Sequence, residues 1–140
     1  MIQQIKKILA PIDFSEYSMR AMRAAWELAK DLNAEMHVVH VVEPQLIISS
    51  RELARESSML EQGEEELARI KKAEFADSDK VTTAVMVGPP VTTLADYANQ
   101  QQISLIVMGT HGRTGGERLL MGSVSEKLAR NAPCSVLIYR

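Results

Sequence analysis

The sequence predicts a doubly wound α/β domain, in which a five-stranded parallel sheet carries helices on both faces. Three observations favour this fold class. Short apolar runs alternate with helical patterns along the whole chain. Strands that are separated by helices return through right-handed crossovers and are therefore parallel. The length of 140 residues is that of one domain, and we predict that residues 1–140 form a single domain.

The first three elements follow from apolar patterns. Residues 5–10 form a short apolar run, and we predict a strand that ends at Pro11. Residues 36–42 are rich in valine, which is typical of a buried strand. Between them, residues 15–33 are predicted to be an amphipathic helix, because apolar side chains recur three and four positions apart at Met22, Ala25, Trp26 and Ala29.

A long charged helix is predicted over residues 51–73. Leu53, Leu60 and Leu67 mark its apolar stripe. Their heptad spacing would also suit a coiled coil, but three leucines with Gly63 among them are more typical of the core face of a surface helix.

The second half of the chain continues the alternation. The strand predicted over 81–87 is broken by Gly88 and two prolines, and a proline suits the first turn of the next helix. The remaining elements are helices over 90–101 and 123–131 and strands over 103–108 and 134–139. The predicted strand order in the sheet is 3-2-1-4-5.

Composition argues against several kinds of partner. The net charge of −2 and the pI of about 5.9 lack the basic excess of a nucleic-acid binder. No run approaches the ~18–20 apolar residues of a membrane span. One cysteine, Cys134, excludes an intrachain disulfide and is expected in the core. We therefore expect a cytoplasmic protein that binds neither nucleic acid nor membrane.

The glycines are concentrated in one loop. Five of the seven lie between the fourth predicted strand and the last helix, at positions 109, 112, 115, 116 and 122. Successive backbone N–H groups in such a loop can form an anion-binding nest, and a helix begins directly after it. His111 and Arg113 add side-chain donors. The loop thus indicates a site for a phosphate chain, and a surface loop without a ligand is the alternative.

Other phosphate and catalytic motifs are absent. The chain has neither the Gly-x-x-x-x-Gly-Lys-Ser/Thr of a P-loop nor a Gly-x-Gly-x-x-Gly after the first strand. It also lacks the Gly-x-Ser-x-Gly elbow of hydrolases. In parallel sheets, ligands bind beyond the carboxyl ends of the strands, which is where the glycine loop begins.

The glycine spacing resembles a known family. Gly109-x2-Gly112-x9-Gly122-Ser123 matches the Gly-2x-Gly-9x-Gly-Ser/Thr motif of universal stress proteins, in their ATP-binding branch. Residues 8–15, the His40-Val41 pair and residues 132–137 are also similar to the family. The resemblance implies an ATP-binding stress-response regulatory protein, with or without Mg²⁺. It places around the nucleotide Pro11, Ile12, Asp13, Val41, Met108, Gly109, His111, Gly112, Arg113, Gly122, Ser123, Val124 and Ser125.

Several of these positions also have a purely structural interpretation. Asp13 is expected in the pocket, but Asp13 or Ser15 could instead cap the first helix. Ser123 and Glu126 have the spacing of a capping box, which competes with a phosphate for the Ser123 hydroxyl. His37 and His40 should lie on opposite faces of their strand, so we expect no metal site there.

Two expectations concern activity and assembly. The chain offers phosphate donors but no evident general base, nucleophile or acidic pair, so no catalytic residue and no metal ligand is predicted. A slow ATPase or nucleotidyl-transfer enzyme remains the alternative, as does a flavin or another adenine-bearing cofactor. The apolar last strand, Ser135 to Tyr139, should lie at a sheet edge, and the resemblance implies that it pairs in a homodimer. A further regulatory protein partner stays open.

Overall fold

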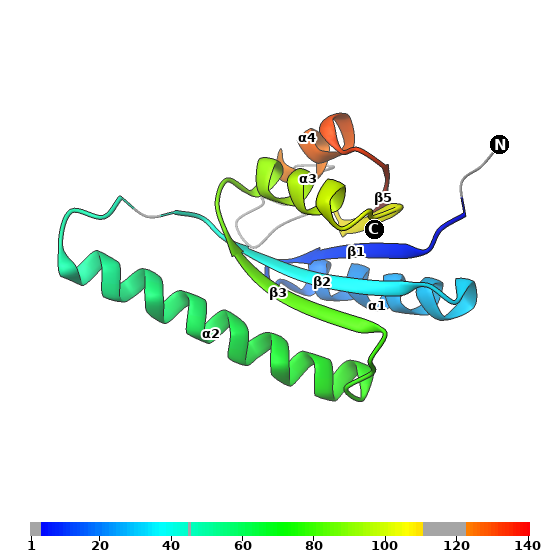
Figure 1. Cartoon of the computed structure of the whole chain (residues 1–140), viewed down its shortest axis with the longest axis horizontal. Coiled ribbons are helices and arrows are strands. Elements are labelled where there is room, and N and C mark those ends of the chain that lie inside the picture. The colour runs from blue at the N-terminus through cyan, green and yellow to red at the C-terminus, as the bar shows by residue number, and fades with distance from the viewer. Residues whose placement is uncertain (1–3, 45, 111–122) are drawn as a thin grey trace.

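Five parallel strands form one sheet in the order β3-β2-β1-β4-β5 (Figure 1). The computed structural model describes residues 4–44, 46–110 and 123–140. The strands are β1 Lys7–Ile12, β2 Glu35–Val42, β3 Val81–Val87, β4 Leu105–Gly109 and β5 Ser135–Tyr139. The predicted fold class and strand order are therefore confirmed.

Helices cover both faces of the sheet. Their bounds are α1 Glu16–Leu32, α2 Ser50–Phe75, α3 Pro90–Gln100 and α4 Ser123–Asn131. α1 and α2 pack on one face, and α3 and α4 on the other (Figure 1). Because side chains alternate along a strand, β1 sends Ile8 and Ala10 to the α1/α2 face and Leu9 to the α3/α4 face.

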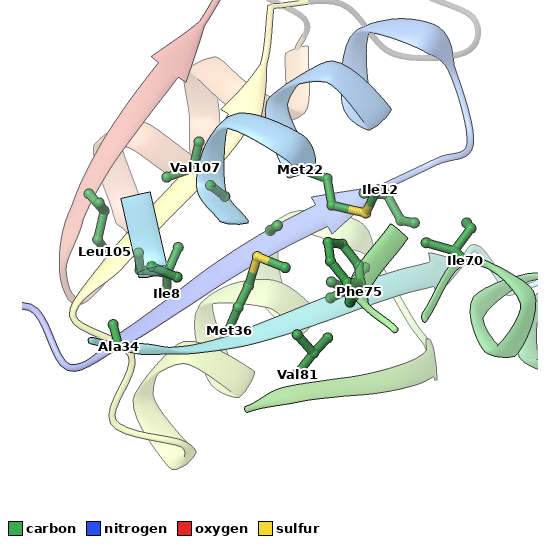
Figure 2. Packing of buried hydrophobic residues seen from close by; sticks show 14 of the residues in the cluster. Ile8, Ile12, Met22, Ala34, Met36, Ile70, Phe75, Val81, Leu105 and Val107 are labelled. Carbon is green, nitrogen blue, oxygen red and sulfur yellow. The ribbon is translucent and has the colours of Figure 1, made fainter. Parts of the chain in front are cut away.

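The core on the α1/α2 face is shown in Figure 2. Met36 of β2 and Val81 of β3 pack there with Met22 of α1 and Phe75 of α2. All four side chains are buried. A second cluster on the other face contains Leu128 of α4. The sheet is therefore buried between two apolar layers, as a parallel sheet requires.

Local signals define both ends of α1. The Ser15 side chain caps its N-terminus by accepting a hydrogen bond from the Ser18 amide at 3.2 Å. Asn33 ends the helix in the left-handed conformation, with φ 53°, which asparagine tolerates well. The predicted range 15–33 therefore covers α1 together with its two cap residues, Ser15 and Asn33.

Several strand bounds differ from the sequence prediction by one or two residues, and two of these differences have a clear structural cause. β1 does not stop at Pro11 but continues through it to Ile12, with Pro11 opposite Val39 of β2. The pairing of β1 with β4 is recorded only at Ile8 and Leu9, so Pro11 lies beyond it, where a missing N–H costs little. β4 begins two residues later than predicted, because the amide of Ile103 is bonded to the carbonyl of Ala98 at the end of α3.

α2 is only partly packed. Gly63, Leu67, Ile70 and Phe75, in its C-terminal half, are buried. Leu53, in the N-terminal half, is 54% exposed, so it does not belong to the core face that the leucine spacing predicts. Figure 1 shows the reason, since this half of the helix extends past the carboxyl ends of β2 and β3.

Cys134 does not lie in the core as expected. It is half-buried and directly precedes β5, whose residues alternate between exposed and half-buried. β5 pairs with β4 on one side only, which makes it an edge strand. The environment of Cys134 is therefore that of an edge, although it still packs against the core on the α3/α4 face.

Candidate functional site at the carboxyl edge

The strand order reverses between β1 and β4. From β1 the chain proceeds to β2 and β3 on one side, and β4 and β5 lie on the other. In open parallel sheets, ligands bind beyond the carboxyl ends of the strands at such a reversal. Here those ends are Ile12 and Gly109, so Asp13 and Thr110 lead out of the sheet at this edge.

Gly109 explains how the two ends come together. A Cβ atom at this position would lie 2.9 Å from the carbonyl oxygen of Tyr17 and 3.1 Å from its carbonyl carbon. Real Cβ atoms almost never approach backbone atoms so closely. Only glycine therefore lets the end of β4 pass against the first turn of α1, which brings the start of the glycine loop to the turn that contains Asp13.

The turn between β1 and α1 is held by a short hydrogen-bond network. Oδ1 of Asp13 accepts from the amide of Ser15 at 3.0 Å. Oγ of Ser18 accepts from the amide of Asp13 at 3.2 Å and donates to the carbonyl of Ser15 at 3.0 Å. Between them, Phe14 has a φ of 66°. Asp13 thus stabilises the turn, while Ser15 is the N-cap of α1.

The predicted site residues approach this edge from both faces of the sheet. Val41, Met108 and Val124 pack in the cluster on the α3/α4 face, while Ile12 belongs to the other cluster. Pro11 and Gly109 are buried within the strands. Four of the predicted residues, His111, Gly112, Arg113 and Gly122, lie outside the described residues.

The first turn of α4 presents one exposed and one buried serine. Ser123 is exposed, whereas Ser125 is 2% exposed. The carboxylate of Glu126 accepts from the Arg130 guanidinium at 3.3 Å, so it is directed along the helix rather than back to its N-terminus. Glu126 therefore bonds to Arg130 and not to the backbone amide that the predicted capping box requires.

The two histidines of β2 lie on opposite faces, as predicted, and have different surroundings. Nδ1 of His37 lies 2.7 Å from the hydroxyl of Tyr97 in α3, and both side chains are buried. Burial lowers the pKa of His37, with a smaller effect from Lys7, and burial raises the pKa of Tyr97. Burial in the core therefore favours the neutral form of His37.

His40 contacts the candidate site directly, which sequence reasoning did not foresee. Its Nδ1 atom lies 2.9 Å from the carbonyl oxygen of Ile12, and its ring centroid lies 4.4 Å from that of Phe14. Its only signal in the sequence was its place in the His40-Val41 pair, where the resemblance concerned Val41.

Other chemistry is limited in the part of the chain that the structure describes. There, no three His, Cys, Asp or Glu residues lie together as they would around a metal ion, and no helix is long and apolar enough to cross a membrane. Burial raises the pKa of the Cys134 thiol, which makes it a poor nucleophile.

A cleft of about 760 Å³ lies at the amino end of β1 and β4, opposite the candidate site, and its lining includes Lys6, Lys7 and Asn99.

This fold and edge define a class of protein: a doubly wound parallel α/β domain whose ligand edge lies where the strand order reverses, between β1 and β4. Within this class, the chain belongs to the universal stress protein family, because the model of that family matches residues 4–140. This membership confirms the resemblance seen in the glycine spacing.

Individual comparisons agree with the family. The chain is 36% identical over 140 residues to the universal stress protein MJ0531 of Methanocaldococcus jannaschii, covering 96% of this chain and 82% of the relative. The solved universal stress protein UspA of Lactobacillus plantarum has a TM-score of 0.86 and 26% identity, with 99% of each chain covered. A universal stress protein solved in complex with cAMP has a TM-score of 0.69 and 24% identity, with 99% of each chain covered, which is a likeness of fold.

Proposed function

We propose that this protein is an ATP-binding regulatory protein of the stress response. In this proposal the glycine loop, residues 109–122, and the N-terminus of α4 hold the phosphates. Asp13 lies near the ribose, and the backbone of Val41 meets the adenine. Nucleotide binding to the loop changes what the protein presents to a partner. The whole chain forms one domain, which we place in the cytoplasm.

The close approach of Gly109 to α1 carries this proposal. It brings the start of the glycine loop next to the Asp13 turn, at the edge where parallel sheets bind their ligands. Five glycines in one loop weaken a fold unless backbone conformation or a ligand requires them. A protein of the same fold solved with cAMP supports an adenine nucleotide as the ligand class.

The direct test is calorimetric titration with ATP. Wild-type protein should bind ATP, and Gly122→Val should abolish binding, because a side chain there blocks the approach of the backbone to the phosphates. Ala129→Val, on the exposed side of α4, adds a similar bulk away from the site and should bind as the wild type does. Unchanged ATP affinity in Gly122→Val would contradict the proposed site.

The same material distinguishes ATP from other adenine-bearing ligands. Mass spectrometry of the purified protein should find an adenine nucleotide, and the visible spectrum should lack the absorption of a flavin. Turnover of ATP far above a slow background, lost in Asp13→Asn or His111→Ala, would favour the enzyme alternative over a regulatory role.

We also propose that two copies pair through β5. Among the described residues, no strand pairs with the outer edge of β5, and the strand exposes Leu137 and Tyr139. Pairing with a two-fold mate would bury this apolar edge. The same edge contains no residue of the candidate site, so dimerisation and nucleotide binding can be tested separately.

Sedimentation at micromolar concentration tests the dimer. The wild type should sediment as a dimer and Leu137→Lys as a monomer, because a charge at the edge opposes pairing. Leu46→Lys changes another exposed leucine, in the connector before α2, and should leave the dimer intact. A monomeric wild type would overturn this part of the proposal.

A further inference from the structure

We propose that His40 is a positioning residue that couples α2 to the nucleotide site, an inference that rests on the proposed function. His40 lies between Gly63 of α2 on one side and the Ile12–Phe14 turn on the other. His40 therefore connects α2, which packs on the sheet only along its C-terminal half, with the end of β1, from which Asp13 leaves the sheet.

The hydrogen bond to Ile12 shows which ring nitrogen of His40 carries a proton. A carbonyl oxygen can only accept, so Nδ1 of His40 carries the proton and donates at 2.9 Å. His40 is also the register partner of Ile12 in the pairing of β1 with β2. Its side chain thus holds the last carbonyl of β1, directly before Asp13.

The contact with Phe14 holds the other side of Asp13. Phe14 has a φ of 66°, a conformation that a bulky residue adopts only when its surroundings require it. Its ring packs against that of His40, with centroids 4.4 Å apart and planes tilted by 44°. Because His40 contacts the residues before and after Asp13, it sets the path of the backbone at Asp13, whose carboxylate the Ser15 amide then holds.

Gly63 brings α2 into this arrangement. It is buried inside a helix, where glycine is unfavourable relative to alanine. A Cβ atom at this position would lie 3.4 Å from Cδ2 of His40 and 3.3 Å from Cγ2 of Val85. The helix backbone itself therefore abuts the imidazole ring, and a displacement of α2 at Gly63 must move or release His40.

The packing of α2 suggests how an event at this helix would reach the Asp13 turn. The N-terminal half of α2 contains no buried residue, while Gly63 begins the half that packs on the sheet. A partner or ligand that shifts this helix would act on the Asp13 turn through His40. His37, three residues earlier on the same strand, contacts Tyr97 on the opposite face and provides a matched comparison.

The first experiment measures ATP affinity in variants of His40. Asn places an amide N–H near the position of Nδ1, whereas Gln places it near Nε2. His40→Leu and His40→Gln should therefore weaken binding by about five- to tenfold, the worth of a lost hydrogen bond, and His40→Asn should restore it to within about twofold. Tyr97→Phe, which removes the partner of His37, should lower stability without changing affinity. If His40 had a merely structural role, its variants would lower stability, as Tyr97→Phe does, and would leave the ATP affinity unchanged.

The second experiment needs no nucleotide. Gly63→Ala should shift the backbone amide resonances of Asp13 and Phe14, because the added methyl contacts the His40 ring, 3.4 Å from Cδ2, and is tighter still against Val85. Ser57→Ala, on the exposed half of α2, also adds helix propensity and should leave those resonances in place.

The two experiments separate the inference from the proposed function. If ATP binds the wild type but affinity is the same in His40→Leu, or if Gly63→Ala leaves the Asp13 and Phe14 resonances unmoved, the coupling is wrong and the proposed function stands. If the wild type binds no ATP, the proposed function fails, and the resonances alone decide whether α2 acts on the Asp13 turn.

Discussion

At the scale of the residue, one strand assigns different chemistry to two histidines. His37 is buried on the α3/α4 face with Tyr97, and His40 bonds to a strand-end carbonyl on the α1/α2 face. Alternation of side chains along β2 predicts the opposite faces. It does not predict the partners, since Tyr97 lies 60 residues away and Ile12 lies 28 residues away.

The buried His37 should make stability depend on pH. Burial lowers its pKa in the folded state, so between the folded and unfolded pKa values the unfolded chain binds more protons. The contribution of His37 is therefore fully present above its unfolded pKa of about 6.5 and is lost as pH falls below it. Urea unfolding at about pH 7.5 and pH 5 should show this decrease.

A double variant isolates this effect. His37→Leu/Tyr97→Phe replaces both partners by apolar groups, which leaves no buried polar atom unpaired and is close to neutral in stability at high pH. Its loss of stability between the two pH values should be smaller than in the wild type. Tyr97→Phe alone leaves Nδ1 of His37 without its partner and should cost about 1–3 kcal/mol at high pH. An equal pH dependence in the wild type and the double variant would contradict the role of His37.

At the scale of the element, the C-cap residues of α1 and α2 differ in how readily they adopt the left-handed conformation. α1 ends with Asn33 in the left-handed conformation, and α2 ends with Ala76, whose φ is 49°. Asparagine adopts this conformation more readily than alanine, and glycine adopts it best. The C-terminus of α2 is therefore a place where the sequence is not optimal for the conformation it adopts.

Two alanine-to-glycine changes, one at the C-cap of α2 and one inside the helix, should change the free energy of unfolding in opposite directions. Ala76→Gly should raise the free energy of unfolding by about 0.5–1 kcal/mol, because it relieves the left-handed strain. Ala68→Gly, at an exposed position inside the helix, should lower it by about 1 kcal/mol. Denaturant unfolding measures both values. A loss of stability in Ala76→Gly would mean that this residue does not adopt the left-handed conformation in solution.

Most elements could be predicted because their signals are local. The bounds of β3 and α4 agree with the prediction, since a proline or a turn follows each. The prediction for β1 failed at Pro11, because the cost of a proline depends on whether a strand lies opposite its missing N–H. The prediction for Leu53 failed because the leucine spacing shows which face is apolar and does not show how far the sheet extends beneath it.

At the scale of the whole molecule, the proposed nucleotide should stabilise the fold. A ligand that binds only the folded state at 100 times its Kd raises the free energy of unfolding by about 2.7 kcal/mol. For a chain of this size, that corresponds to an increase in Tm of roughly 5–15 °C. Calorimetry with and without ATP should show the increase in the wild type and not in Gly122→Val. A similar shift in both would place ATP at another site.

The sequence alone determined the fold class, the order of the elements and the loop in which the glycines lie, because periodicity and glycine or proline positions are properties of neighbouring residues. Tertiary structure decided how the site is assembled. The approach of Gly109 to Tyr17, the contact of Gly63 with His40 and the bond from His40 to Ile12 join segments far apart in the chain. No local pattern records these contacts, since each depends on how closely two packed elements approach each other.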